Sequence, residues 1–346
     1  MSRRAYLDAG IGEARGVVVL DGRPERLLIV RDDDPPCQRL GARSVARARK
    51  IDRALGLAFL QLPEGPDAVL ELRRESGRLV EGQALLVEIR SEGRGDKGPS
   101  VRLAGEAEGP PKLAAPAPAL EETLAALAPD AAIETGPDAR AFADAAEAEA
   151  LESVFPIPGG GSLAVERTRA LIAVDVDVGA RPGAEAKRNV RAANLAALAA
   201  AARILRLKGE GGLVVIDLAG RGHDGPALIA AARSAFAPDN PGVALGPISR
   251  FGTLELTVPR RRRPALERLL DADGQLSLET LALRLTRALE RQATTDPGAR
   301  IRARAAPALA ERATPYIRRL AERFGARFEV VADPDRPRDR FEVEAP

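Results

Sequence analysis

Residues Leu171 to Gly179 read Leu-Ile-Ala-Val-Asp-Val-Asp-Val-Gly, and the fold of the chain can be predicted outward from them. The run of Leu, Ile and Val predicts a mostly buried strand. Asp175 and Asp177 lie near its end, and because they are two residues apart their side chains leave the same face of an extended chain. Two carboxylates in such a place repel each other and lose hydration, and a hard divalent cation offsets both costs.

A second strand of the same kind follows downstream. Residues 211–217 read Gly-Gly-Leu-Val-Val-Ile-Asp, so this strand also ends in a carboxylate, that of Asp217. A long Ala-rich helix is expected between the two strands, and another helix after the second. This order predicts an α/β layer, in which functional groups often lie at the carboxyl ends of strands. If the strands are neighbours, Asp175 and Asp217 can meet at one edge of the sheet and form a magnesium site.

The composition limits the classes of protein to consider. A chain of 346 residues can form two or three domains, and with 3% aromatic residues its core must consist mainly of Ala, Val and Leu. The net charge of +2 means that any nucleic-acid surface is a local patch. One cysteine, Cys37, and one histidine exclude an internal disulfide and an ordinary structural zinc site within one chain. No signal region or membrane-spanning run is found, so a cytoplasmic location is expected.

The order of strands, turns and helices divides the chain into five predicted segments. The first contains a hairpin whose turn is Asp21-Gly22. The segments are 1–40 with this hairpin, 41–104 as a small β-barrel, 105–154 as a linker with one or two helices, 155–263 as the α/β layer and 264–346 as a separate small α/β module.

Basic residues gather in the predicted barrel. Arg49 and Lys50 lie on its first strand, Arg94 and Lys97 lie in a Gly-bearing turn, and Phe59 lies on a further strand. Cations beside an aromatic side chain on a barrel face are typical of a surface for single-stranded nucleic acid. The alternative is a solvated face with Phe59 in the core.

Four further residues are weaker candidates for function. Arg260 and Arg261 begin a run of four arginines that could bind a phosphate backbone, although such runs are as often simply solvated. Arg250 lies in a predicted turn and is a further RNA-binding candidate. His223, the single histidine, follows Asp217 by six residues, and a lone loop histidine is more often incidental than catalytic.

These motifs, in this order, resemble the bacterial ribonuclease E/G family. The strand of Asp175 is similar to that family's Ala-Ile-Asp-Val-Asn-Ser-Gly, and the strand of Asp217 to its Leu-Ile-Val-Ile-Asp-Phe. Further similar segments are Ala58-Phe59, Arg94–Gly98, Ile157–Ser162, Asn194-Leu195, Leu205–Lys208 and Ile248–Glu255.

The resemblance implies a multidomain α+β and α/β fold. Its parts would be an RNase H-like module with an inserted OB-type barrel, a DNase I-like catalytic layer and a small C-terminal α/β domain. It also implies a metal-dependent endoribonuclease of RNA processing or decay, which leaves 5′-phosphate and 3′-hydroxyl ends on single-stranded RNA. Asp175 and Asp217 would hold Mg²⁺, with Mn²⁺ as a substitute, Asp177 would assist them, and Phe59 and Lys97 would stack on and steer the RNA.

The chain departs from the family pattern at four places. Asp177 stands where the family has Asn, which orients the metal ligands. Residues 66–70 lack the family's second barrel aromatic, and residues 105–150 are too short for its 5′-phosphate sensor, so strong 5′-monophosphate sensing is not expected. Residues 271–274, Asp-Ala-Asp-Gly, replace the Cys-x-x-Cys zinc link, so a homodimer would form without zinc.

Two alternatives stay open. A non-catalytic RNA-binding relative of the family would show the same barrel without metal-stimulated cleavage. An ordinary α/β protein would use Asp175 and Asp217 only to cap strands and would bind no magnesium.

Overall fold

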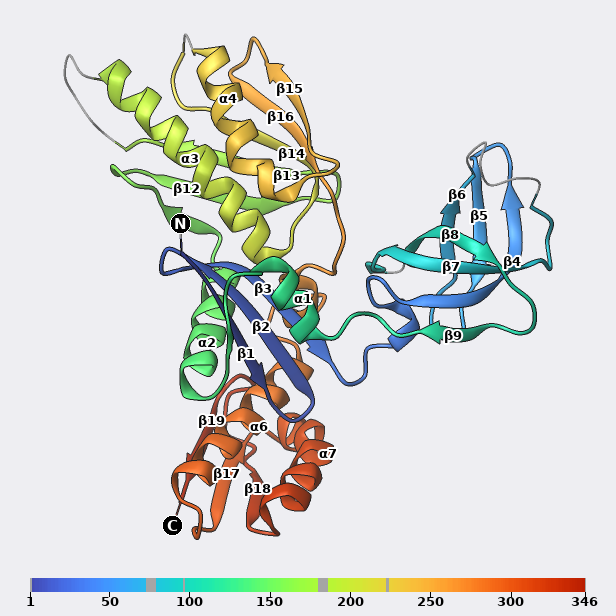
Figure 1. Ribbon diagram of the computed structural model, residues 1–346. Helices are drawn as coiled ribbons and strands as arrows, with labels where there is room; N and C mark the ends of the chain where they lie inside the picture. Colours follow the sequence, from blue (N-terminus) through green and yellow to red (C-terminus); the bar gives the residue numbers. More distant parts are fainter. Residues whose placement is uncertain (1, 73–78, 96, 180–185, 222–223, 346) are drawn as a thin grey trace.

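The computed structural model describes residues 2–72, 79–95, 97–179, 186–221 and 224–345. Figure 1 shows a small N-terminal sheet in the middle of the molecule, with the barrel to one side, a larger helix-covered sheet above it and a C-terminal module below it. The mixed α/β, multidomain class is therefore confirmed. Within the described residues, no helix is both long enough and apolar enough to cross a bilayer.

The N-terminal sheet carries helices on both faces. The predicted hairpin is confirmed, and its turn places Asp21 and Gly22 at φ 48° and 81°. Tyr6 packs toward the second helix, whereas its neighbour Leu7 packs toward the first, as the alternation of a strand requires. In the order β10-β1-β2-β3, the strands are β1 Arg3–Ala9, β2 Glu13–Leu20, β3 Arg23–Arg31 and β10 Ile133–Glu134, with helices α1 Leu120–Leu127 and α2 Pro137–Leu151.

The barrel is a six-stranded sheet that closes on itself through pairing of β4 with β5. Ala58 and Leu60 point into its core of small aliphatic side chains. The last strand lies beyond the predicted end at residue 104, because Lys112–Ala115 pairs with β4. The strands are β4 Arg43–Asp52, β5 Leu57–Gln61, β6 Ala68–Glu71, β7 Ala84–Ser91, β8 Ser100–Glu106 and β9 Lys112–Ala115.

The larger sheet has the order β11-β12-β13-β14-β16-β15, and its only described parallel pair is β13 with β14. The glycine run at residues 159–161 is a hairpin turn between β11 and β12. The strands are β11 Val154–Pro156, β12 Ser162–Arg167, β13 Ile172–Asp177, β14 Gly212–Asp217, β15 Ala244–Ile248 and β16 Thr253–Val258, and the helices are α3 Ala186–Lys208 and α4 Gly225–Phe236, followed by the short η3 Ala237–Asp239.

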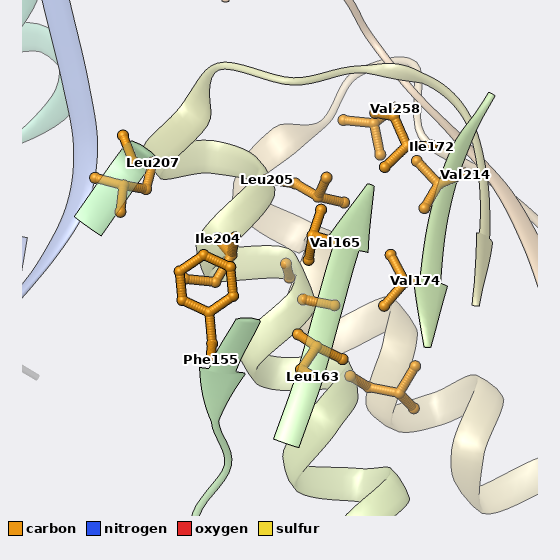
Figure 2. Packing of buried hydrophobic residues seen from close by; sticks show 14 of the residues in the cluster. Phe155, Leu163, Val165, Ile172, Val174, Ile204, Leu205, Leu207, Val214 and Val258 are labelled. Carbon is orange, nitrogen blue, oxygen red and sulfur yellow. The ribbon is translucent and has the colours of Figure 1, made fainter. Parts of the chain in front are cut away.

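Alternation along these strands decides which face is covered. Every second residue points to the helices, and these residues form one core with α3, as Figure 2 shows for Val174, Val214 and Leu205. The residues between them, including the three aspartates of interest, point to the other face and are exposed or half-buried. The larger sheet therefore has one packed face and one face directed to solvent.

The C-terminal module is a three-stranded sheet covered by helices. It docks onto the N-terminal sheet at the buried Glu13 of β2, which accepts hydrogen bonds from Arg31 of the neighbouring β3 and from Arg287 of the module. Its elements are α5 Ala265–Leu269, α6 Leu278–Thr295, β17 Ile301–Ala305, α7 Pro307–Phe324, β18 Phe328–Ala332 and β19 Phe341–Glu344.

Candidate active site

Asp175 and Asp217 lie side by side at the carboxyl ends of two neighbouring strands. The register of the parallel pair β13–β14 places Asp175 directly beside Asp217. Neighbouring strands are about 4.8 Å apart, and paired residues direct their side chains to the same face. Both aspartates are exposed on the face that the helices leave free. The two carboxylates therefore share one solvent-facing position at the edge of the sheet.

More acidic side chains lie on this face. Asp177 follows two residues after Asp175, Glu166 lies on β12, and Glu255 lies on β16, beside the strand of Asp217. In the described part of the chain, no lysine or arginine forms an ion pair with Asp175, Asp177 or Asp217. A phosphate group would be repelled from such a face unless a cation lay between them.

Asp177 also has a structural task. Its Oδ1 accepts a hydrogen bond of 2.8 Å from the backbone N–H of Gly179. Gly161 of the β11–β12 turn lies against the same backbone, and a Cβ there would come within 2.3 Å of the carbonyl oxygen of Asp177. The contacts fix the main chain at the end of β13, next to the carboxylate pair.

The donor set fits magnesium better than a transition metal. Mg²⁺ is commonly held by one or two carboxylates and completes its octahedral shell with water and substrate phosphate. Among the described residues, no three His, Cys, Asp or Glu side chains gather as a ready-made metal cluster. Asp175 and Asp217 therefore suit a metal that takes most of its ligands from outside the protein.

A turn beside Asp217 presents an exposed aromatic side chain. Phe251 is 76% exposed, and the guanidinium of Arg250 lies 4.7 Å from the centre of its ring. Ser249 holds this turn, because its hydroxyl lies 2.7 Å from that of Thr253 and accepts a hydrogen bond from the N–H of Phe251. Thr253 is paired with Asp217 across β14 and β16, so the ring and the carboxylates belong to the same end of the sheet.

Sequence reasoning placed Arg250 here but missed Phe251. The missed signal was a large apolar side chain inside a predicted turn, in a chain with few aromatic residues. The exposed ring offers a flat apolar face on which a planar ligand could stack.

Asn194 fixes the chain after Asp217. Its buried side chain donates to the carbonyl of Ala219 and accepts from the N–H of Ala219, both at 3.0 Å. This pair of bonds ties helix α3 to the loop that leaves β14. The Asn-Leu motif thus has a positioning role that its sequence alone did not indicate.

The barrel presents a second exposed group of the predicted residues. Phe59 is half-buried and lies outside the barrel core, with the ammonium of Lys50 6.0 Å from its ring centre. The interpretation of Phe59 as a core residue is therefore wrong. Arg49 is exposed 3.6 Å from Asp67, and Lys97 is exposed in its turn. Val69 stands opposite Phe59, at the place where residues 66–70 offer no second aromatic.

Arg94 and Arg260 lie in a structural cluster instead. Arg94 lies 3.9 Å from Glu267, which also pairs with Arg167, and Arg167 pairs with the buried Glu210. Burial, Arg94 and Arg167 lower the pKa of Arg260. These contacts join the barrel turn to the larger sheet and to α5, so the structure assigns Arg94 and Arg260 a docking role that the sequence had not suggested.

The last two candidates from the sequence are Arg261 and His223. Arg261 is exposed and donates to the carbonyl of Pro241 at 3.2 Å, so its guanidinium stays at the surface. His223 lies outside the described residues.

The carboxylate pair lies in a segment that matches a known family. Residues 141–263 match the ribonuclease E/G family. A chloroplastic ribonuclease E/G-like protein of Arabidopsis thaliana is 31% identical over 121 residues, which are 34% of this chain and 12% of that protein. Ribonuclease E of Escherichia coli is 34% identical over 117 residues, 32% of this chain and 11% of the relative. Ribonuclease E of Haemophilus influenzae is likewise 34% identical over 117 residues, 32% of this chain and 12% of the relative.

The resemblance is therefore confirmed over residues 141–263, from α2 to the arginine run. This segment contains β11 to β16, the carboxylate pair and the turn of Phe251. The barrel and the C-terminal module lie outside it. The chain spans about an eighth of the length of the curated relatives it matches.

Proposed function

We propose that this chain is a metal-dependent endoribonuclease that hydrolyses single-stranded RNA and leaves 5′-phosphate and 3′-hydroxyl ends. The observation that carries the proposal is the in-register pair of Asp175 and Asp217 inside the segment that matches the ribonuclease E/G family. A pair that only capped strands would not require both carboxylates to be exposed on the same face and paired in register.

In this proposal Asp175 and Asp217 hold Mg²⁺, with Mn²⁺ as a substitute. The bound cation would polarise a phosphoryl oxygen of the scissile bond and favour an incoming water. The two carboxylates contribute the negative charge that attracts the cation, and the cation offsets the repulsion between this acidic face and RNA. Asp177 keeps the end of β13 in place through its bond to Gly179.

The turn of Phe251 positions the substrate. A nucleotide base can stack on the exposed ring, and stacking is tolerant of sequence because every base has a π-face. Arg250 lies over the same ring and can contact the adjoining phosphate. The barrel surface of Phe59, Lys50, Arg49 and Lys97 binds the strand further along.

The second candidate is a non-catalytic RNA-binding relative. It is favoured by the carboxylate at Asp177, which is engaged with Gly179 where the family has a metal-orienting Asn. It would use the same surfaces without cleavage.

The deciding experiment is cleavage of a fluorescent AU-rich single-stranded RNA, with and without magnesium. Wild-type protein should cut only with the metal, and Asp217→Asn should not cut. Glu166→Gln is the matched control, because it removes an exposed carboxylate from the same face of the sheet. Glu166 pairs with Ala173, two residues before Asp175. RNA bound but uncut by wild type would favour the second candidate, and equal rates for wild type and Asp217→Asn would refute the nuclease proposal.

A further inference from the structure

A cavity of about 460 Å³ lies where four parts of the molecule meet, away from the exposed carboxylates. Its walls come from β3, from α1, from the end of α3 and from residues 258–268, which lead from the larger sheet to α5. Figure 1 shows α1 beside the N-terminal sheet, which it contacts at β1 and β2. Pockets of roughly 300–1,000 Å³ are the usual size for small-molecule ligands.

One part of the cavity wall is apolar. Leu28 of β3, Leu127 of α1 and Val258 of β16 contribute aliphatic side chains to it, and Ala126 adds a small one. Leu28 and Val258 also belong to the hydrophobic cores on either side. The cavity therefore offers a ligand an apolar surface that is fixed by packing.

Another part of the wall is cationic. Six arginines line the cavity against four carboxylates. Of the four lining arginines that are not exposed, Arg26 and Arg262 have the longest ion pairs: Arg26 lies 3.3 Å from Asp239, and Arg262 lies 4.0 Å from Glu92 and donates to the hydroxyl of Thr123. Their side chains are only 23% and 27% exposed.

The protonation equilibria of the two arginines agree with this geometry. Burial lowers the pKa of Arg26 although Asp239 opposes the shift, and burial lowers the pKa of Arg262 although Glu92 opposes it. Arginine stays protonated in proteins, so each remains a cation whose hydration has been partly removed. An anion in the cavity would restore part of the lost stabilisation through charge-assisted hydrogen bonds.

We propose that this cavity binds a small organic anion: a phosphate or carboxylate group carried on an apolar or planar body. Arg262, which contacts Thr123 of α1, would bind the anionic group, and Leu28, Ala126 and Leu127 would contact the body. Because the walls come from separate parts of the chain, a bound ligand would hold α1 against the larger sheet. It would also hold β9, the barrel strand that precedes α1 in the chain. The proposal does not depend on the ribonuclease activity.

The test is isothermal titration of the full chain with adenosine monophosphate, adenosine and inorganic phosphate, in EDTA so that no metal bridges ligand and carboxylates. Adenosine monophosphate should bind at least about tenfold more tightly than adenosine or inorganic phosphate, because it alone can contact both the cationic and the apolar part of the wall. Arg262→Gln should weaken its binding about tenfold or more.

Helix α1 supplies a matched pair of variants that do not disturb the arginines. Ala125 and Ala126 are both exposed, but only Ala126 lines the cavity. Ala126→Phe should abolish binding, and Ala125→Phe should leave it within about twofold. Asp217→Asn should bind as wild type does, which separates this site from the sheet edge.

Three results would overturn the proposal. They are the absence of monophosphate binding at millimolar concentration, equally tight binding of adenosine, and unchanged binding by folded Ala126→Phe. Folding of each variant is checked by its thermal transition.

Discussion

Two groups of carboxylates in this molecule are treated in opposite ways. Between the N-terminal sheet, α2 and α6, buried acids are surrounded by arginines: Arg15 is 1% exposed and binds the buried Asp8 and Glu147 as well as the exposed Asp144. On the open face of the larger sheet, Asp175 and Asp217 are exposed and form no ion pair within the described residues. A buried carboxylate needs a cationic side chain of the protein itself, whereas an exposed carboxylate can bind a cation from solution. The first group should therefore control stability and the second activity.

The largest expected effect is on folding and comes from the buried group. Arg15→Met leaves Asp8 buried without its main partner and removes one of the three arginines that pair with the buried Glu147. Removal of one member of a buried ion pair costs about 3–5 kcal/mol. Urea unfolding should show this loss. Arg302→Met is the control, because it removes an arginine whose ion pair with Glu329 is exposed, and its cost should stay below about 1 kcal/mol. Similar losses for the two variants would contradict the comparison.

The next effect is on activity and comes from the exposed pair. Asp175→Asn should lower the cleavage rate by at least about 100-fold, equivalent to about 2.7 kcal/mol in the barrier, because it removes a proposed metal ligand. Its unfolding free energy should equal or exceed that of wild type, since repulsion between two neighbouring carboxylates is relieved. A loss of stability together with activity would show that Asp175 is a structural residue.

A smaller effect is expected at the turn of Phe251. Phe251→Ala should weaken RNA binding by about 1–3 kcal/mol, the usual contribution of one stacked base, with little change in stability because the ring is exposed. Phe251→Tyr keeps an aromatic face and should bind as wild type does. Fluorescence anisotropy with a labelled single-stranded RNA measures both. If the Tyr variant binds as weakly as the Ala variant, Phe251 does not act by stacking.

Local patterns predicted much of this fold because the patterns and the packing agree. The Asp21-Gly22 turn, the Ala-rich α3 and the two Asp-terminated strands were all found where expected. Asp175 and Asp217 could be placed together because adjacent strands in such a layer commonly lie side by side. The contacts of Asn194 with Ala219 and of Arg260 with its cluster could not be predicted, because they depend on how separate segments dock.

Phe59 shows the same limit of prediction from sequence, because the sequence left open whether it lies on the barrel surface or in the barrel core. Its strand alternates Ala58, Phe59 and Leu60, and the pattern alone does not say which side of a barrel faces inward. The structure directs Ala58 and Leu60 to the core, which leaves Phe59 beside Lys50 on the surface. Register, which is set by the whole sheet, decided the matter.

The smallest effect distinguishes the two groups by their response to acid. Burial alone would raise the pKa of Glu147, but Arg287, Arg15 and Arg284 together lower it below its ordinary value of 4.5. A carboxylate whose pKa is lower in the folded state stabilises the fold above its unfolded pKa, and this contribution is lost as the pH falls through the folded pKa. Wild-type stability should therefore decline below about pH 4.5, and Glu147→Gln, less stable at neutral pH, should show a shallower decline. Thermal unfolding from pH 3 to 7 measures the two slopes, and a Glu147→Gln slope as steep as that of wild type would mean that other acids control the acid response.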